Sequence, residues 1–171
     1  MISRQWRGLA RTDARSHMSI DEQQIRDSGP ESVQTFFYGL FMDMDLLHGK
    51  GVRATNHRLA RLDDYRLHIG ARAALVRASG RTVYGVLMDV LEEDLQRLYA
   101  EPGLDTYVRE DLEVTLSDGR RAVAIAYNLP ALLLDSRPNV AYAQKLQSVG
   151  AKLGLPEEYL AQIRAQAEDS P

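Results

Sequence analysis

The chain has 171 residues, 44% hydrophobic and 26% charged, which suffices for one globular domain that buries about two thirds of its unfolded surface. Cysteine is absent, so the sequence excludes disulfide bonds, thiol nucleophiles and thiolate metal sites. The net charge of −3, without a long block of one sign, argues against a nucleic-acid surface, and no apolar run reaches the roughly 18 residues of a membrane-spanning helix.

The first 32 residues differ in composition from the rest of the chain. Four arginines occur by residue 15 against a single acid, and Ser28-Gly29-Pro30 then marks a linker boundary. The segment lacks the apolar centre of a secretory signal peptide. We therefore expect a disordered leader at residues 1–32, with Met18 as an alternative start and a transit peptide as a further alternative, before a domain at residues 33–167. Because the absence of cysteine fits a reducing compartment, we expect a cytoplasmic protein.

The stretch from Gln34 to Asp43 changes from a strand pattern to a helix pattern within two residues. Its Thr, Phe, Phe and Tyr favour a half-buried strand, Gly39 lets the backbone bend, and Asp43 is placed to cap a short helix through Leu47. Main-chain amides at such a turn can bind a carboxylate or an oxyanion, and an ordinary strand-to-helix turn is the alternative. The following Gly49-Lys50-Gly51 lacks the spacing of a P-loop and is interpreted as a turn.

The next part of the chain predicts short strands. Turn-forming residues separate the apolar runs, first at Asp63-Asp64 and then at Ala78-Ser79-Gly80. Gly85 lies inside the most apolar run, which indicates a bulge or the close approach of another segment. The predicted strands cover residues 52–62, 65–69, 73–77 and 82–88.

Helical periodicity and a hairpin pattern follow. One helical face is predicted at residues 91–99, with Asp89 as its cap, and Pro102-Gly103 must end this helix near Glu101. Asp118-Gly119 between two alternating runs is a strong hairpin signal. Two more helices are predicted from the periodicity of residues 142–153 and 159–163.

Several apparent functional sites have simpler interpretations. The histidines are His17, His48, His57 and His68. None are spaced as a metal-binding pair on a helix, so no metal site is expected. Asp43-Met44-Asp45 is better explained by helix capping, because a spacing of two places the carboxylates on different helix faces. Ser117 and Ser136 lack the context of a nucleophile elbow.

Four motifs, taken in order, resemble those of the γ-glutamylcyclotransferase-like superfamily, including its AIG2-like and γ-glutamylamine cyclotransferase branches. The motifs are Phe37-Tyr38-Gly39-Leu40-Phe41, similar to the Tyr-Gly substrate loop; Val83-Tyr84-Gly85-Val86-Leu87, similar to the central strand; Glu101 with Tyr107 and Arg109, similar to the catalytic acid segment; and residues 138–163, similar to the carboxyl-terminal helices. The likeness covers about residues 35–164. Two positions depart from it. Leu40-Phe41 replace Ser, Thr or Asn-containing variants and predict a more apolar pocket, and Tyr99 stands where an Asp is common.

The resemblance implies an α+β fold, a small mostly antiparallel β-barrel with surrounding helices. It implies a small-molecule substrate with a γ-glutamyl or similar amide group, whose α-amine attacks the γ-carbonyl and releases 5-oxoproline and an amine. Glu101 is the implied general acid/base, a role that a pKa raised toward neutrality by apolar neighbours would help. The implied substrate-binding residues are Tyr38, Gly39, Leu40, Phe41, Met42 and Tyr107. The chemistry requires no metal, nucleotide or redox cofactor.

Two other functions stay open on the same scaffold, because one fold supports many functions. The first is a non-catalytic module that binds a small acidic or amide metabolite. The second is a related amide-cleaving acyl transfer that keeps Glu101 as acid/base. An enzyme predicts that Glu101 faces a cavity beside the Tyr38-Gly39 turn. We further expect Arg109 to pair with a neighbouring acid and Tyr127 to pack in the core.

Overall fold

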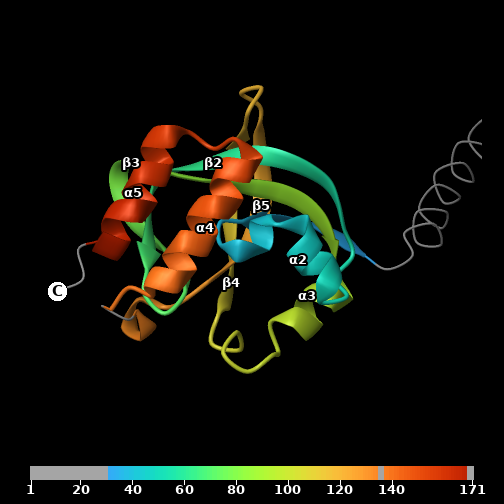
Figure 1. The fold of residues 1–171 in the computed structure, drawn as a ribbon. Coiled ribbons are helices and arrows are strands. Elements are labelled where there is room, and N and C mark those ends of the chain that lie inside the picture. The colour runs from blue at the N-terminus through green and yellow to red at the C-terminus, as the bar shows by residue number, and fades with distance from the viewer. Residues whose placement is uncertain (1–30, 135–136, 169–171) are drawn as a thin grey trace, which may run out of the picture. The chain divides into compact units, whose positions relative to one another are not determined.

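Five β-strands close into a barrel whose interior takes up the apolar side chains of each strand. The computed structural model describes residues 31–134 and 137–168. The strands are β1 (Ser32–Phe37), β2 (Ala54–Ile69), β3 (Ala73–Leu91), β4 (Val108–Leu116) and β5 (Arg121–Asn128) (Figure 1). Their order around the barrel is β1-β3-β2-β4-β5, and all neighbours are antiparallel except β1 and β5, which pair in parallel. The predicted α+β fold with a mostly antiparallel barrel is confirmed.

Two long strands, β2 and β3, replace the four short strands predicted for this part of the chain. They have 16 and 19 residues and pair along most of their length. Asp64 does not end a strand; it lies in a bulge with φ of 65°, and its carboxylate accepts a hydrogen bond of 3.0 Å from the Gly80 amide of the other strand. The two predicted turns are therefore wrong. Their turn-forming residues face each other across an irregular part of one continuous ladder.

The pairing of β1 with β3 brings two backbones unusually close. A side chain on Gly85 would place its Cβ 2.3 Å from the carbonyl oxygen of Phe37 and 2.8 Å from the ring of Phe36. The predicted close approach at Gly85 is thus confirmed, and it presses the end of β1 against the centre of β3. β1 begins at Ser32, the last residue of the predicted leader. Residues 1–30 of that predicted leader lie outside the described residues.

Short helical segments connect the strands, and two longer helices follow the last strand. They are η1 (Leu40–Met42), α2 (Met44–Gly49), α3 (Glu92–Leu98), η2 (Ala131–Leu133), α4 (Val140–Leu153) and α5 (Glu157–Glu168). Asp43 caps α2 as predicted, accepting a hydrogen bond of 3.0 Å from the Asp45 amide. Asp89 does not cap α3, because it remains in β3 and accepts hydrogen bonds from β2 side chains. The helix begins later, with Leu91 in the cap position.

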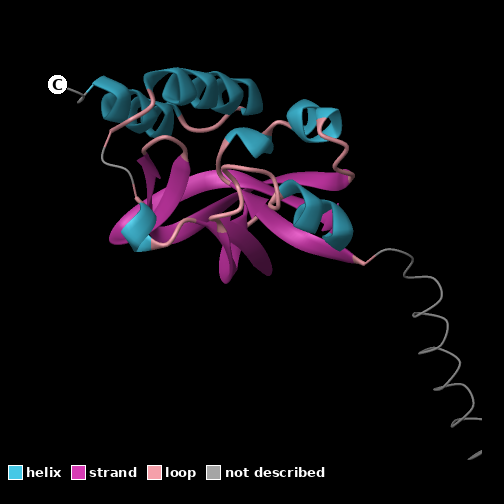
Figure 2. Ribbon diagram, turned by 90° about the horizontal axis from the view of Figure 1, so that it is seen from below, coloured by secondary structure: helices cyan, strands magenta, loops and turns pink. Residues whose placement is uncertain are grey.

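The two carboxyl-terminal helices lie against one face of the strands (Figure 2). Asn139 caps α4, and Gly154, with φ of 78°, ends it. Tyr159 of α5 packs edge-on against Tyr84 of β3, with ring centroids 5.1 Å apart. The predicted hairpin is also present, with Gly119 between β4 and β5 at φ of 89°. In the described ranges, none of the helices has both the length and the apolar character needed to span a membrane.

Candidate active site

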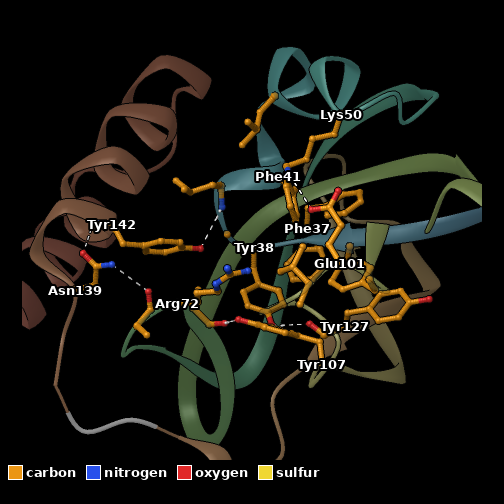
Figure 3. Close-up of a pocket in the computed structure, with 18 of the residues that line it drawn as sticks. Phe37, Tyr38, Phe41, Lys50, Arg72, Glu101, Tyr107, Tyr127, Asn139 and Tyr142 are labelled. Carbon is orange, nitrogen blue, oxygen red and sulfur yellow. Dashed lines mark hydrogen bonds and ion pairs between the residues drawn. The ribbon is translucent and has the colours of Figure 1, made fainter. Parts of the chain in front are cut away.

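A cavity of about 370 Å³ lies where β1 turns into η1, beside the start of α4 and the turn between β2 and β3 (Figure 3). Eight of its 19 lining residues are aromatic, namely Phe36, Phe37, Tyr38, Phe41, Tyr99, Tyr107, Tyr127 and Tyr142. Among the described residues that line it, the charged side chains are Lys50, Arg72 and Glu101. The cavity is therefore lined mainly by apolar and aromatic side chains, together with three charged ones.

The turn after β1 supplies one wall of the cavity. Gly39, Leu40 and Phe41 line it, as does Tyr38. Met42 does not, because its side chain is fully buried in the core and its amide donates a hydrogen bond of 3.0 Å to the Gly39 carbonyl within η1. Of the five residues of this turn that were predicted to bind substrate, four line the cavity and the fifth, Met42, lies in the core.

Gly39 is required here by a close approach, not by its backbone angles. A Cβ at this position would lie 2.6 Å from the hydroxyl oxygen of Tyr142, a residue of α4. The same hydroxyl accepts a long hydrogen bond of 3.4 Å from the Leu40 amide. The turn and α4 are consequently held together at the cavity wall.

The hydroxyl groups of two cavity tyrosines are held by backbone carbonyls. Tyr38 donates a hydrogen bond of 2.7 Å to Tyr127, and Tyr107 donates one of 2.7 Å to Ala73. Burial raises the pKa of Tyr38 and the pKa of Tyr107 above their ordinary value, as it does the pKa of Tyr99. These three phenols therefore stay neutral at physiological pH and form part of the cavity wall, and none of them is a general base.

The two departures from the family pattern contact each other. Phe41 packs edge-on against Tyr99 with ring centroids 6.3 Å apart, and Tyr99 stacks on Tyr127 at 3.8 Å and 7°. Tyr127, expected to be core packing, thus also lines the cavity. The packed rings of Phe41, Tyr99 and Tyr127 make this side of the cavity apolar, as predicted from Leu40-Phe41.

Glu101 follows α3 and carries the carboxylate that lines the cavity among the described residues. Its Oε2 lies 3.0 Å from the Nζ of Lys50, and the two side chains are 41% and 35% exposed. The apolar surroundings expected for this carboxylate are thus interrupted by an ammonium group. Glu101 and the Tyr38–Gly39 turn nevertheless line the same cavity, although more than 60 residues separate them in sequence.

Three cavity residues have no counterpart in the prediction. Lys50 was assigned to a turn, Arg72 belongs to no motif, and Asn139 had no assigned role; Asn139 Nδ2 donates a hydrogen bond of 3.3 Å to the Ala71 carbonyl. Arg109 lies away from the cavity and pairs with Glu92, so the predicted ion pair is confirmed. Within residues 31–134 and 137–168, no group of three or more His, Cys, Asp or Glu side chains is arranged to hold a metal ion.

Comparison with known proteins agrees with this architecture. A family model described as "Gamma-glutamyl cyclotransferase, AIG2-like" matches residues 35–145, more than half of the chain. A protein named gamma-glutamylcyclotransferase from Bos taurus is 25% identical over 158 residues, covering 84% of this chain and 83% of its own length. A solved structure titled gamma-glutamyl cyclotransferase superimposes with a TM-score of 0.65 at 21% identity, over 79% of this chain and 88% of that one. The structure of YkqA from Bacillus subtilis has a TM-score of 0.67 at 20% identity, over 88% of this chain and 59% of that one. The two structures show a shared fold.

Proposed function

This chain belongs to the gamma-glutamyl cyclotransferase, AIG2-like family, and on that premise we propose that it converts γ-glutamyl amides into 5-oxoproline and a free amine. The observation that carries the proposal is the shared cavity, which Glu101 lines together with the Tyr38–Gly39 turn. A carboxylate can carry protons, and a turn with main-chain donors can hold an anion. The reaction needs both parts in one place.

The substrate supplies its own nucleophile. The α-amino nitrogen forms a bond to the γ-carbonyl carbon, which closes a five-membered lactam, and the bond from that carbon to the leaving nitrogen breaks. Because the two reacting groups belong to one molecule, holding the ring-closing conformer supplies much of the acceleration. The aromatic walls around Tyr99 and Tyr107 would restrict the bound chain to such a conformer.

Glu101 would carry the protons between the two nitrogens. The α-ammonium loses two protons on its way to the lactam nitrogen, and the departing nitrogen gains two as it becomes a free ammonium, so protons and charge balance. Lys50 orients the carboxylate through the contact of 3.0 Å between its Nζ and Glu101 Oε2. Since both partners are partly exposed, the pair is weak enough to open when the substrate ammonium arrives.

Main-chain donors of the turn would hold the anionic part of the reaction. The Gly39 and Phe41 amides are the candidates, for either the substrate carboxylate or the oxyanion that develops on the γ-carbonyl, and the Leu40 amide joins them when it gives up its long hydrogen bond of 3.4 Å to the Tyr142 hydroxyl. The Met42 amide is not a candidate, because it already donates to the Gly39 carbonyl. Met42 is thus removed from the residues of the turn that we propose to bind the substrate.

Release of 5-oxoproline from a panel of γ-glutamyl dipeptides, γ-glutamyl amines and glutathione tests the proposal. Glu101→Gln keeps the size of the side chain and removes its titratable proton, and we expect kcat to fall by about 10²- to 10⁴-fold. Asp105→Asn is the matched control, because Asp105 lies four residues further on, is exposed and does not line the cavity. Equal release by the wild type and the Gln variant would overturn the role of Glu101. No release from any member of the panel would refute the activity.

A further inference from the structure

Arg72 is the charged cavity residue that the proposed reaction leaves without a role. It lies in the turn between β2 and β3, whereas Lys50 and Glu101 come from the end of α2 and from the loop after α3. Figure 3 shows its guanidinium pointing inward beside the ring of Tyr142, apart from the Lys50–Glu101 pair. The cavity therefore has two separate charged groups, the Lys50–Glu101 ion pair and the Arg72 guanidinium.

The turn that carries Arg72 is held by three hydrogen bonds, one of them to Arg72 itself. The Gly70 amide donates to the Arg72 carbonyl at 3.0 Å, which closes the turn. Asn139 ties the turn to the start of α4, through its amide to Gly70 at 2.8 Å and through its side chain to Ala71 at 3.3 Å. A side chain on such a turn is presented to the cavity in advance, so little ordering remains for a ligand to induce.

The side chain of Arg72 packs where Gly103 has no side chain. Gly103, two residues after Glu101, has φ of 85°, and a Cβ there would lie 2.8 Å from an Nη atom of Arg72. The guanidinium thus packs against bare backbone, where a larger residue would displace it. Its field also acts on the phenols of Tyr107 and Tyr142, both of which line the cavity.

The guanidinium is half-buried, and no carboxylate of the described residues pairs with it. Among the described residues, no carboxylate lies within ion-pairing distance of it and no hydrogen bond is made by its side chain. Lys50 and Glu101 neutralise each other, so among the described residues that line the cavity Arg72 carries the one positive charge without a carboxylate partner. A planar guanidinium with free donors is suited to a carboxylate, which it can bind in bidentate geometry.

We propose that Arg72 is a specificity-determining residue that binds a carboxylate on the leaving side of the substrate. The inference rests on the proposed function. Glu101 would receive the α-ammonium, the main-chain donors of the turn would hold the γ-glutamyl half, and Arg72 would bind the far end of the departing amine. The charges then match, because a γ-glutamyl amino acid carries a net charge of −1 and a γ-glutamyl alkylamine carries none. The leaving group is accordingly an amino acid or short peptide with a free carboxylate.

A matched pair of compounds tests this reading, γ-glutamyl-alanine and γ-glutamyl-alaninamide, which differ in the carboxylate alone. We expect the wild type to prefer the acid by about 10- to 100-fold in kcat/KM, the range for a hydrogen-bonded charge. Arg72→Gln should abolish that preference by lowering kcat/KM for the acid to the level of the amide. Arg72→Lys should keep part of the preference, because it retains the charge and loses the bidentate geometry. Arg121→Gln removes an exposed arginine of β5, away from the cavity lining, and should keep the full preference.

The results separate the role of Arg72 from the activity itself. A wild type that treats both compounds alike overturns the proposal, as does an Arg72→Gln variant that loses equally on both, since Arg72 would then bind the shared half. If neither compound yields 5-oxoproline, the proposed function fails. Calorimetric binding of the same two compounds to the wild type and to Arg72→Gln then decides the role of Arg72: a preference for the acid that depends on Arg72 supports it, and equal binding overturns it.

Discussion

Replacing Gly39 with alanine tests whether the cavity depends on the close packing of the turn against α4. The φ of Gly39 is −108°, so alanine fits the backbone without strain, and the perturbation is a single methyl group. That methyl would lie 2.6 Å from the Tyr142 hydroxyl oxygen, whereas ordinary contact begins at 3.4 Å. The hydroxyl or the turn must therefore move by about 0.8 Å.

A displacement of this size acts directly on the proposed binding turn. It lengthens the hydrogen bond from the Leu40 amide, which is already 3.4 Å, and shifts the neighbouring amides relative to Glu101. A misplacement near 1 Å can lower a rate about 100-fold, and overpacking costs about 1–3 kcal/mol of stability. We expect Gly39→Ala to lower kcat/KM for 5-oxoproline release by about 10- to 100-fold while the protein remains folded.

The double variant with Tyr142→Phe gives the assay its control. Removing the hydroxyl oxygen leaves Ala73 Cβ at 3.7 Å and the ring carbon of Tyr142 at 4.0 Å as the nearest atoms, both at ordinary contact distance. We therefore expect the double variant to be more active than Gly39→Ala and close to Tyr142→Phe alone, which loses one long hydrogen bond. Losses that simply add in the double variant would refute the steric reasoning, as would full activity of Gly39→Ala.

Three further predictions concern the support of the site. Asp94 is fully buried, and hydrogen bonds from Arg53 lower its pKa from 3.8 to about 2, so its stabilising contribution is present above pH 4 and is lost as the pH falls toward 2. Asp94→Asn should therefore lower the free energy of unfolding in urea at pH 7 by about 1–3 kcal/mol and make stability less dependent on pH below 4. An unchanged dependence of stability on acid pH would contradict this role of Asp94. Gly85→Ala should destabilise the barrel by about 3 kcal/mol or more, because its Cβ would meet the Phe37 carbonyl oxygen at 2.3 Å, and an unchanged urea midpoint would show that β1 and β3 can separate there. Lys50→Met should lower the free energy of unfolding at pH 7 by about 1 kcal/mol or less, since the Lys50–Glu101 pair is partly exposed, and a clearly larger loss in urea unfolding would contradict the weak pair.

Local patterns predicted the elements whose cause lies within a few residues. The Asp43 cap, the turn at Gly119 and the helix that ends at Gly154 each depend on side chains or glycines at the element itself. The break predicted at Asp63-Asp64 failed because its outcome depends on Gly80, 16 residues away, whose amide binds the Asp64 carboxylate. A turn-forming residue becomes a bulge when the opposite strand supplies such a partner.

The site shows the same division. The Tyr38–Gly39 turn and Glu101 could be predicted from ordered motifs, and the structure brings them to one cavity. Lys50 and Arg72 could not, because each reaches the cavity through tertiary contacts: Lys50 meets a carboxylate 51 residues away, and Arg72 fits against the bare backbone of Gly103. A single sequence carries no local signal for either approach.

The measurement that tests the central claim most directly is turnover of a γ-glutamyl amide in H₂¹⁸O, with mass analysis of the acyl product. Intramolecular attack by the α-amine uses no water, so we predict 5-oxoproline without ¹⁸O, formed in equal amount to the released amine by the wild type and lost with Glu101→Gln. Hydrolysis of the amide would instead place a solvent oxygen in the released carboxylate. Glutamate carrying ¹⁸O as the first product would therefore contradict the cyclotransferase account, even if Glu101 proved essential.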